Sequence, residues 1–107
     1  DGLAMSSRNV YLSPTEREIA AAIPQALFAA EARYHAGERD AEALRALVRA
    51  HLAATPGIQL EYVSVADAKT LDELDTVDRP ALLSLAARVG TTRLIDNVLL
   101  GISVEEW

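Results

Sequence analysis

The spacing of apolar residues changes from a helical repeat to a strand repeat at Thr55-Pro56-Gly57. Before this point, apolar side chains recur every three or four residues, as they do on one face of an α-helix. After it, Ile58, Leu60 and Tyr62 alternate with polar residues and lead into a valine-rich stretch, as in a strand with one buried face. The change predicts helices first and strands afterwards, which is the order of an α+β domain.

The first helical segment is predicted to begin at Ser13-Pro14-Thr15-Glu16. Ser13 can cap the helix, Pro14 suits the first helical position, and Glu16 can complete a capping box. Pro24 has no amide hydrogen, so we expect a kink or a restart there, and Gly37 ends the segment. The apolar residues at helical spacing are Ile19, Ile23, Leu27, Ala30 and Tyr34.

A second amphipathic helix is predicted between a cap at Asp40 and the stop at Thr55-Pro56-Gly57. We expect Glu42, Arg45 and Arg49 to face water on this helix. Its buried stripe is formed by Leu44, Leu47, Val48 and Leu52.

The C-terminal half is predicted to hold three strands. Residues 80–89, "PALLSLAARV", suit either a helix or a buried strand, and the hairpin turn expected at Gly90-Thr91-Thr92 favours a strand that returns through 93–100. In the acidic stretch 67–78, we expect Leu71 and Leu74 to hold a loop or short helix against the core. The predicted fold class is α+β, with helical segments on one face of a small three-stranded antiparallel sheet.

Composition limits the classes of function. The 107 residues suffice for one domain, and 10 basic against 16 acidic residues give a net charge of −6. Because the basic residues are scattered, we expect no binding to nucleic acid or to membranes. The chain has no cysteine, no signal-peptide pattern and no membrane-length apolar run, which predicts a soluble, cytoplasmic protein.

Most of the polar residues have a structural interpretation. His35 and His51 stand near the predicted ends of the two helical segments, where a cation is favoured. Asp96-Asn97 interrupts an apolar strand, and hydrogen bonding to a neighbouring turn is its simplest interpretation. Asp72, Glu73, Asp75 and Asp78 lack the glycine and the spacing of a calcium loop. We therefore predict no metal site and no catalytic residue.

The segment Met5-Ser6-Ser7-Arg8 has donors suited to phosphate oxygens. The arginine can bind two oxygens at once, and each serine can add a hydrogen bond. Such donors matter most where negative charge builds, as when pyrophosphate leaves a nucleotide. Taken as a bare tetrapeptide, the same residues also suit a disordered polar terminus.

The longer string "DGLAMSSRNVYLS", residues 1–13, closely resembles the segment that opens the C-terminal domain of the pantothenate synthetase (pantoate–beta-alanine ligase) family. Further strings agree with that family in order and spacing, so that the resemblance extends to about Gly101. They are "ER" at 16–17, "AGERD" at 36–40, "YVSVADAKTLDEL" at 62–74 and "GTTRLIDN" at 90–97.

The resemblance implies a ligase of the nucleotidyltransferase superfamily, in which a Rossmann-like N-terminal domain holds most of the active site and a smaller C-terminal domain closes over it. In that family the pantoate carboxylate attacks the α-phosphate of ATP with assistance from Mg²⁺, giving pantoyl adenylate and pyrophosphate. The amine of beta-alanine then displaces AMP to form pantothenate. Splitting the reaction in this way activates a carboxylate that is otherwise a poor acyl donor.

By the same resemblance, Met5, Ser6, Ser7 and Arg8 are the counterpart of the "KMSKS" loop of class I aminoacyl-tRNA synthetases and bind ATP. Ser6, Ser7 and Arg8 are expected at its phosphates, and Met5 is expected to place main chain near the nucleotide. No residue here matches a catalytic residue of the family, a Mg²⁺ ligand, or a contact to pantoate or beta-alanine.

The expected organisation is an interdomain ATP-phosphate loop over 1–13, a C-terminal α+β domain over 14–101 and a tail over 102–107. The expected partners are ATP and a missing N-terminal Rossmann-like domain, and self-association into a homo-oligomer is plausible. The chain alone is expected to be inactive. The alternatives are a stand-alone interaction module and a plain structural domain whose opening loop is inert.

Overall fold

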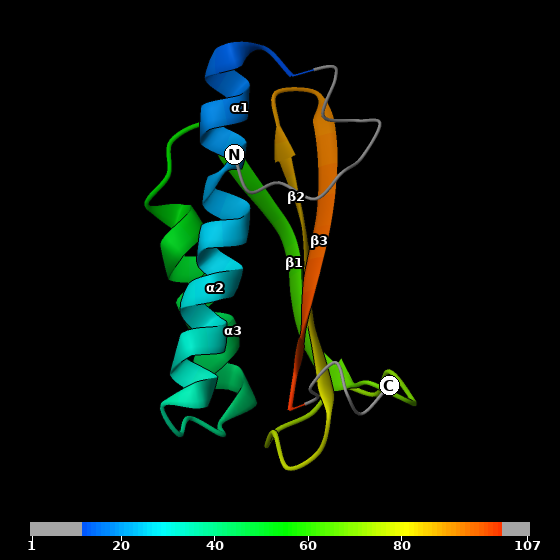
Figure 1. The fold of residues 1–107 in the computed structure, drawn as a ribbon. Coiled ribbons are helices and arrows are strands. Elements are labelled where there is room, and N and C mark those ends of the chain that lie inside the picture. Colours follow the sequence, from blue (N-terminus) through cyan, green and yellow to red (C-terminus); the bar gives the residue numbers. More distant parts are fainter. Residues whose placement is uncertain (1–11, 102–107) are drawn as a thin grey trace.

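Helices precede strands in the chain, as predicted, and the two predicted helical segments form three helices. The computed structural model describes residues 12–101 (Figure 1). The helices are α1 (Pro14–Ala20), α2 (Ala22–His35) and α3 (Ala41–Ala53), and the strands are β1 (Ile58–Asp67), β2 (Ala81–Val89) and β3 (Thr92–Leu100).

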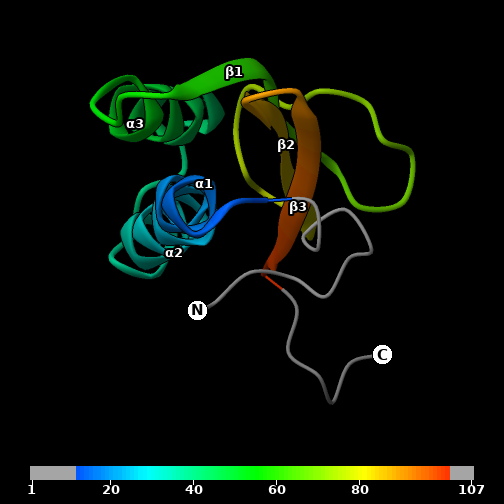
Figure 2. The ribbon, with the colours of Figure 1, turned by 90° about the horizontal axis from the view of Figure 1, so that it is seen from above.

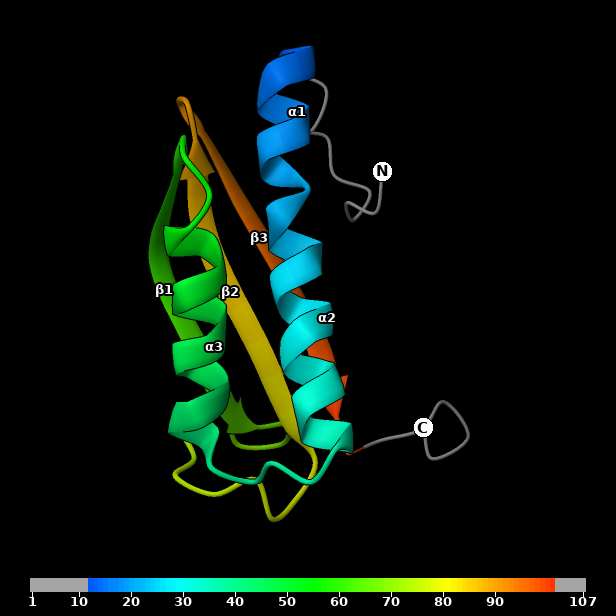
Figure 3. The same ribbon diagram turned by 90° about the vertical axis from the view of Figure 1, so that its left-hand side faces the viewer.

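The molecule has two layers, one helical and one a sheet. The strands form a single antiparallel sheet in the order β1-β2-β3. All three helices lie on the same face of this sheet, with α3 over β1 and with α1 and α2 beside β2 and β3 (Figures 2 and 3). The predicted α+β class and the three-stranded antiparallel sheet are confirmed.

The first helical segment is divided at Ala21, which separates α1 from α2. Pro24 lies in the first turn of α2 and has no N–H to donate to the carbonyl of Ala20, so the α1 ladder cannot continue through it. The next donor, the N–H of Gln25, makes only a long bond of 3.4 Å to the carbonyl of Ala21. The predicted restart is confirmed, and it falls three residues before the proline that causes it.

Two turn residues shape the connection from α2 to α3. Gly37 has φ +117°, and its N–H donates to the carbonyl of Tyr34 while the N–H of Glu38 donates to that of Arg33, both at 3.0 Å. This pair of bonds is a Schellman motif, which ends a helix most easily on glycine. Asp40 then caps α3 by accepting the N–H of Glu42 at 3.0 Å.

The core lies between the helices and the inner face of the sheet. Alternate residues of β2 point inward, and all five have no exposed surface: Ala81, Leu83, Leu85, Ala87 and Val89. They meet the predicted stripe of α3, in which Leu44, Val48 and Leu52 are buried and Leu47 is partly buried. This alternation confirms that residues 81–89 form a strand with one buried face.

A β-bulge in β1 changes which residues face the core. The pairing with β2 shifts between Leu60 and Tyr62, so that Glu61 is an extra residue on its strand. Because each added residue reverses the side on which the next side chains project, Tyr62 lies on the outer face and is 43% exposed. The prediction that Tyr62 shares the buried face with Ile58 and Leu60 is wrong.

The acidic connection between β1 and β2 is a loop without a helix. Leu74 packs against the core as predicted. Leu71 does not, because it occupies a turn with φ +65° and its side chain is 64% exposed. The apolar anchor on this side of the loop is Val77, which is 2% exposed.

The predicted hairpin joins β2 to β3 through Gly90 and Thr91. Val89 pairs with Thr92, which leaves a loop of two residues. Gly90 has φ +62° at the first loop position, as a type II′ turn requires. Within residues 12–101, no helix is both long enough and apolar enough to cross a membrane.

Candidate functional site

The residues predicted to bind ATP, Met5, Ser6, Ser7 and Arg8, lie outside the described residues. The structure does describe where that segment joins the domain. Leu12 is 7% exposed and belongs to the core, and Ser13 forms a complete capping box with Glu16. Leu12 therefore anchors this end of the segment, while its neighbour Tyr11 lies outside the described residues.

The β2–β3 hairpin lies beside this junction. Glu16 accepts the N–H of Ser13 at 3.0 Å through Oε1, and its other oxygen lies where a Cβ on Gly90 would project. Gly90 thus meets two requirements, a positive φ and a close approach to the start of α1. The turn and the helix cap together fix the place where residues 1–11 join the domain.

Two arginines and a glutamate form a charged cluster on the outer face of the sheet, next to the hairpin. Arg88 and Arg93 are directly opposite one another on β2 and β3, an arrangement that is unfavourable for like charges. Glu61, displaced by the bulge, accepts hydrogen bonds from the Nε atoms of Arg93 at 2.5 Å and Arg88 at 2.6 Å. These guanidinium groups, Arg93 first, lower the pKa of Glu61, and Glu61 raises the pKa of Arg93.

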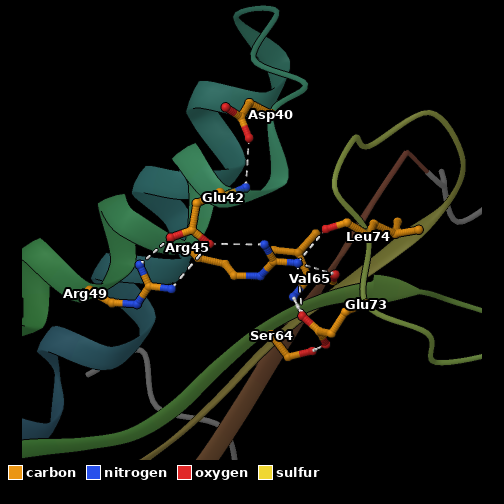
Figure 4. Close-up of polar contacts among 8 residues, drawn as sticks. All are labelled: Asp40, Glu42, Arg45, Arg49, Ser64, Val65, Glu73 and Leu74. Carbon is orange, nitrogen blue, oxygen red and sulfur yellow. Dashed lines mark hydrogen bonds and ion pairs between the residues drawn. The ribbon is translucent and has the colours of Figure 1, made fainter.

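A second polar network connects α3, β1 and the acidic loop through Arg45 (Figure 4). Its side chain is only 12% exposed, which corrects the prediction that Arg45 faces water. Nη2 donates to the carbonyls of Leu74 at 2.6 Å and Val65 at 3.2 Å, and the guanidinium pairs with Glu73 at 3.0 Å. One side chain therefore joins α3 to a strand and a loop that follow it by 20 and 29 residues.

Neighbouring groups complete this network. Glu73 accepts the Val65 N–H at 3.3 Å and the hydroxyl of Ser64. On the other side, Glu42 pairs with Arg45 at 3.2 Å and with Arg49 at 2.8 Å (Figure 4). Glu42 and Arg49 are 59% and 47% exposed, so the prediction that these two face water is confirmed.

The Arg45 network has the properties of a structural clamp. It ends on backbone carbonyls, and no buried side-chain donor or acceptor in the described residues lacks a partner. A sequence signal for it exists, because Arg45 is four residues after Ala41 and three before Val48, both of which are fully buried. An arginine at the border of an apolar stripe can lay its stem along the core and direct its head to carbonyls.

A shallow cavity of about 410 Å³ lies where the acidic loop meets β2, lined by Asp67, Lys69, Asp78, Arg79 and Pro80. Asp67 accepts the backbone N–H groups of Lys69 and Thr70 at 2.7 and 3.2 Å. These bonds, followed by the contact with Arg79, lower the pKa of Asp67. Its carboxylate is thus occupied by the loop itself and by Arg79.

The histidines and acidic residues bring no further chemistry together. His35 is in the last turn of α2 and His51 in the last turn of α3, as predicted. Among residues 12–101, no group of three or more His, Cys, Asp or Glu side chains could hold a metal ion.

Comparison with known proteins associates the chain with one family. Residues 1–99 match the profile of the family described as pantoate-beta-alanine ligase. The pantothenate synthetase of Roseiflexus sp. (strain RS-1) is 58% identical over 100 residues, and that of Roseiflexus castenholzii is 57% identical. In each case the match covers 94% of this chain and 36% of the relative.

A solved structure supports the same association. The crystal structure of pantothenate synthetase from Thermus thermophilus superimposes with a TM-score of 0.83 at 36% sequence identity. The match covers 91% of this chain and 35% of that one. The chain therefore spans about a third of the length of the proteins that it resembles.

Proposed function

The chain belongs to the pantoate-beta-alanine ligase family, and on that premise we propose that it is the C-terminal, ATP-facing domain of a pantothenate synthetase. The full enzyme condenses pantoate and beta-alanine through a pantoyl adenylate, with release of pyrophosphate and then AMP. It works in the cytoplasm, and the domain alone does not catalyse the reaction.

One observation carries the proposal: 94% of the chain matches 36% of a pantothenate synthetase at 58% identity. A match this extensive covers the opening segment as well as the folded core, since the family profile extends from residue 1 to residue 99. The remaining two thirds of the relatives has no counterpart in this chain. That part would supply the Rossmann-like domain and the sites for pantoate and beta-alanine.

In this proposal, Ser6, Ser7 and Arg8 donate hydrogen bonds to the ATP phosphates, and Met5 places main chain beside the nucleotide. Arg8 is the only positively charged side chain of the four, so it stabilises the charge that develops as pyrophosphate leaves. As the resemblance to the family implies, the ligands for the Mg²⁺ that accompanies ATP come from the other domain.

The test is made on the full-length enzyme with the variants Arg8→Ala and Arg33→Ala. Arg33 is an exposed arginine on α2 and serves as the matched control. We expect Arg8→Ala to lower the rate of pantoate-dependent exchange between ATP and pyrophosphate by about 100-fold, the usual loss for one preorganised donor. Arg33→Ala should leave the rate unchanged.

Two outcomes would contradict the proposal. Equal ATP affinity by calorimetry and equal rates in the wild-type and Arg8→Ala enzymes would identify an inert loop on a structural domain. Pantothenate formation by residues 1–107 alone would contradict the assignment of catalysis to the other domain. Activity that appears only when the N-terminal portion is added would support the assignment of this chain as one domain of the enzyme and of catalysis to the other domain.

A further inference from the structure

The outer face of the sheet carries apolar side chains in rows. Tyr62, Ala86 and Ile95 are cross-strand neighbours on the three strands. Tyr62 is 43% exposed and Ile95 is 54% exposed, while Ala86 between them has no exposed surface. A second row near the other end of the sheet consists of Ala66, Leu82 and Leu99.

Polar rows separate and border these apolar rows. Ser64, Ser84 and Asn97 lie between the two, and Glu61, Arg88 and Arg93 lie on the hairpin side of Tyr62. The other two large apolar side chains that are exposed in residues 12–101 are Phe28 on α2 and Leu71 in the loop between β1 and β2, and neither belongs to these rows. An apolar centre with a charged rim is typical of a contact surface between domains.

None of the three helices covers this face. They all lie on the opposite side of the sheet (Figures 2 and 3). A partner that packs on this face therefore comes from beyond residues 12–101, and the relatives offer a large one, since this chain spans 36% of their length.

The position of the chain's entry points to the same occupant. The described chain begins at Leu12 beside the β2–β3 hairpin, and the Glu61, Arg88 and Arg93 cluster borders the same hairpin on the outer face. A domain joined through residues 1–11 thus has its attachment at this end of the sheet. In the Thermus structure, the matched fold is likewise only 35% of a longer chain.

We propose that the outer face of the sheet is the surface on which the N-terminal domain packs, with Tyr62 and Ile95 at the centre of the contact and Arg88 and Arg93 at its rim. The inference rests on the proposed function insofar as it requires that domain. It adds a location for the contact, on the side of the sheet opposite the helices.

The test measures side-chain oxidation by hydroxyl radicals, read peptide by peptide in a mass spectrometer. It compares the full-length polypeptide with residues 1–107, whose folded state is checked by slow amide exchange in β2. We expect the peptide with Tyr62 to be oxidised at least about 5-fold more slowly in the full-length protein, because the centre of an interface is fully buried. The peptide with Phe28, 61% exposed on α2, serves as the internal control and should keep the same rate.

Each other outcome overturns the inference. Equal rates for Tyr62 in the two proteins would show that the face stays open, and slow oxidation of Phe28 alone would place the contact on the helices. Protection of Tyr62 that is lost on dilution would identify a second copy as the occupant. Protection of Tyr62 that is already present in a dilute solution of residues 1–107 would identify a terminal segment of this chain as the occupant.

A variant separates this inference from the proposed function. In the full-length protein, Ile95→Asp should restore rapid oxidation of Tyr62, whereas Phe28→Asp should not. Protection of Tyr62 without ligase activity would support the contact and contradict the function. Ligase activity of the full-length protein without protection of Tyr62 would support the proposed function and contradict the contact.

Discussion

Arg45 shows how one side chain can decide the position of a loop. Its guanidinium is held by the carbonyls of Val65 and Leu74 and by Glu73, so it links α3 both to β1 and to the acidic connection (Figure 4). Without Arg45, the carbonyl of Leu74 loses a charged donor at 2.6 Å and the carbonyl of Val65 keeps only the N–H of Leu74 at 2.9 Å. Loss of a nearly buried charged donor costs more than loss of an exposed pair.

We therefore predict that Arg45→Met lowers the free energy of unfolding by about 2 kcal/mol, because its bonds are made by a charged and nearly buried donor. Amide exchange should accelerate in residues 68–77 more than in β2. Urea unfolding and hydrogen exchange measure the two effects. Arg49→Met, which removes only an exposed partner of Glu42, should change stability much less, and equal losses in both variants would refute the clamp.

The elements that begin and end on local signals are those that could be predicted. Ser13, Asp40 and Gly37 act through bonds that span at most five positions, so a short stretch of sequence contains both partners of each bond. The break between α1 and α2 follows from Pro24 for the same reason. The predicted hairpin also depends on local geometry, at Gly90.

We predict that Ser13→Ala lowers the free energy of unfolding by about 1 kcal/mol, since the N–H of Glu16 then loses its acceptor at the helix start. Ser13→Asn should keep most of the stability, because asparagine caps as well as serine. Thr15→Ala, at an exposed position in the same turn, is the matched control for urea unfolding. A loss in the asparagine variant as large as in the alanine variant would exclude capping as the cause.

Two residues of the strand half were predicted wrongly, Tyr62 because its position depends on distant partners and Leu71 because a local turn exposes it. Tyr62 faces outward because of the bulge at Glu61, and the bulge lets Glu61 meet Arg88 and Arg93 from β2 and β3. The sequence does contain a signal for the bulge, since the apolar positions change from even numbers at Ile58 and Leu60 to odd numbers at Val63 and Val65. Leu71 was predicted to pack against the core from its apolar character alone, but its turn conformation exposes it.

On the scale of the whole molecule, charge complementarity makes stability depend on pH. Arginines lower the pKa of three carboxyl groups, and backbone N–H groups lower that of a fourth: these are Glu42, Glu61, Asp78 and Asp67. In each case the folded protein binds the proton more weakly than the unfolded chain does. Stability from these groups is therefore fully present above their ordinary values of 4.5 for Glu and 3.8 for Asp, and falls with pH through the folded values.

We predict that the midpoint temperature of unfolding stays nearly constant from neutral pH down to about pH 5.5 and then decreases as acid is added. The midpoint temperature of the Glu61→Gln variant should decrease less steeply over the acid range, because one of the four groups no longer titrates. It should also be less stable than the wild type at neutral pH, since the two opposed arginines lose their shared anion. Identical slopes for the two proteins would contradict the contribution of Glu61.

The candidate ATP-binding residues stay a prediction from the sequence, because Met5 to Arg8 lie outside the described residues. Local sequence was enough for the α+β class, the helix caps, the break near Pro24 and the hairpin, since each depends on nearby backbone geometry or on a short period of apolar residues. Only the tertiary structure decided the role of Arg45, the outward direction of Tyr62 and the uncovered face of the sheet. The position of Arg45 and the bulge that turns Tyr62 outward involve contacts between residues 20 to 32 positions apart, which no local pattern specifies.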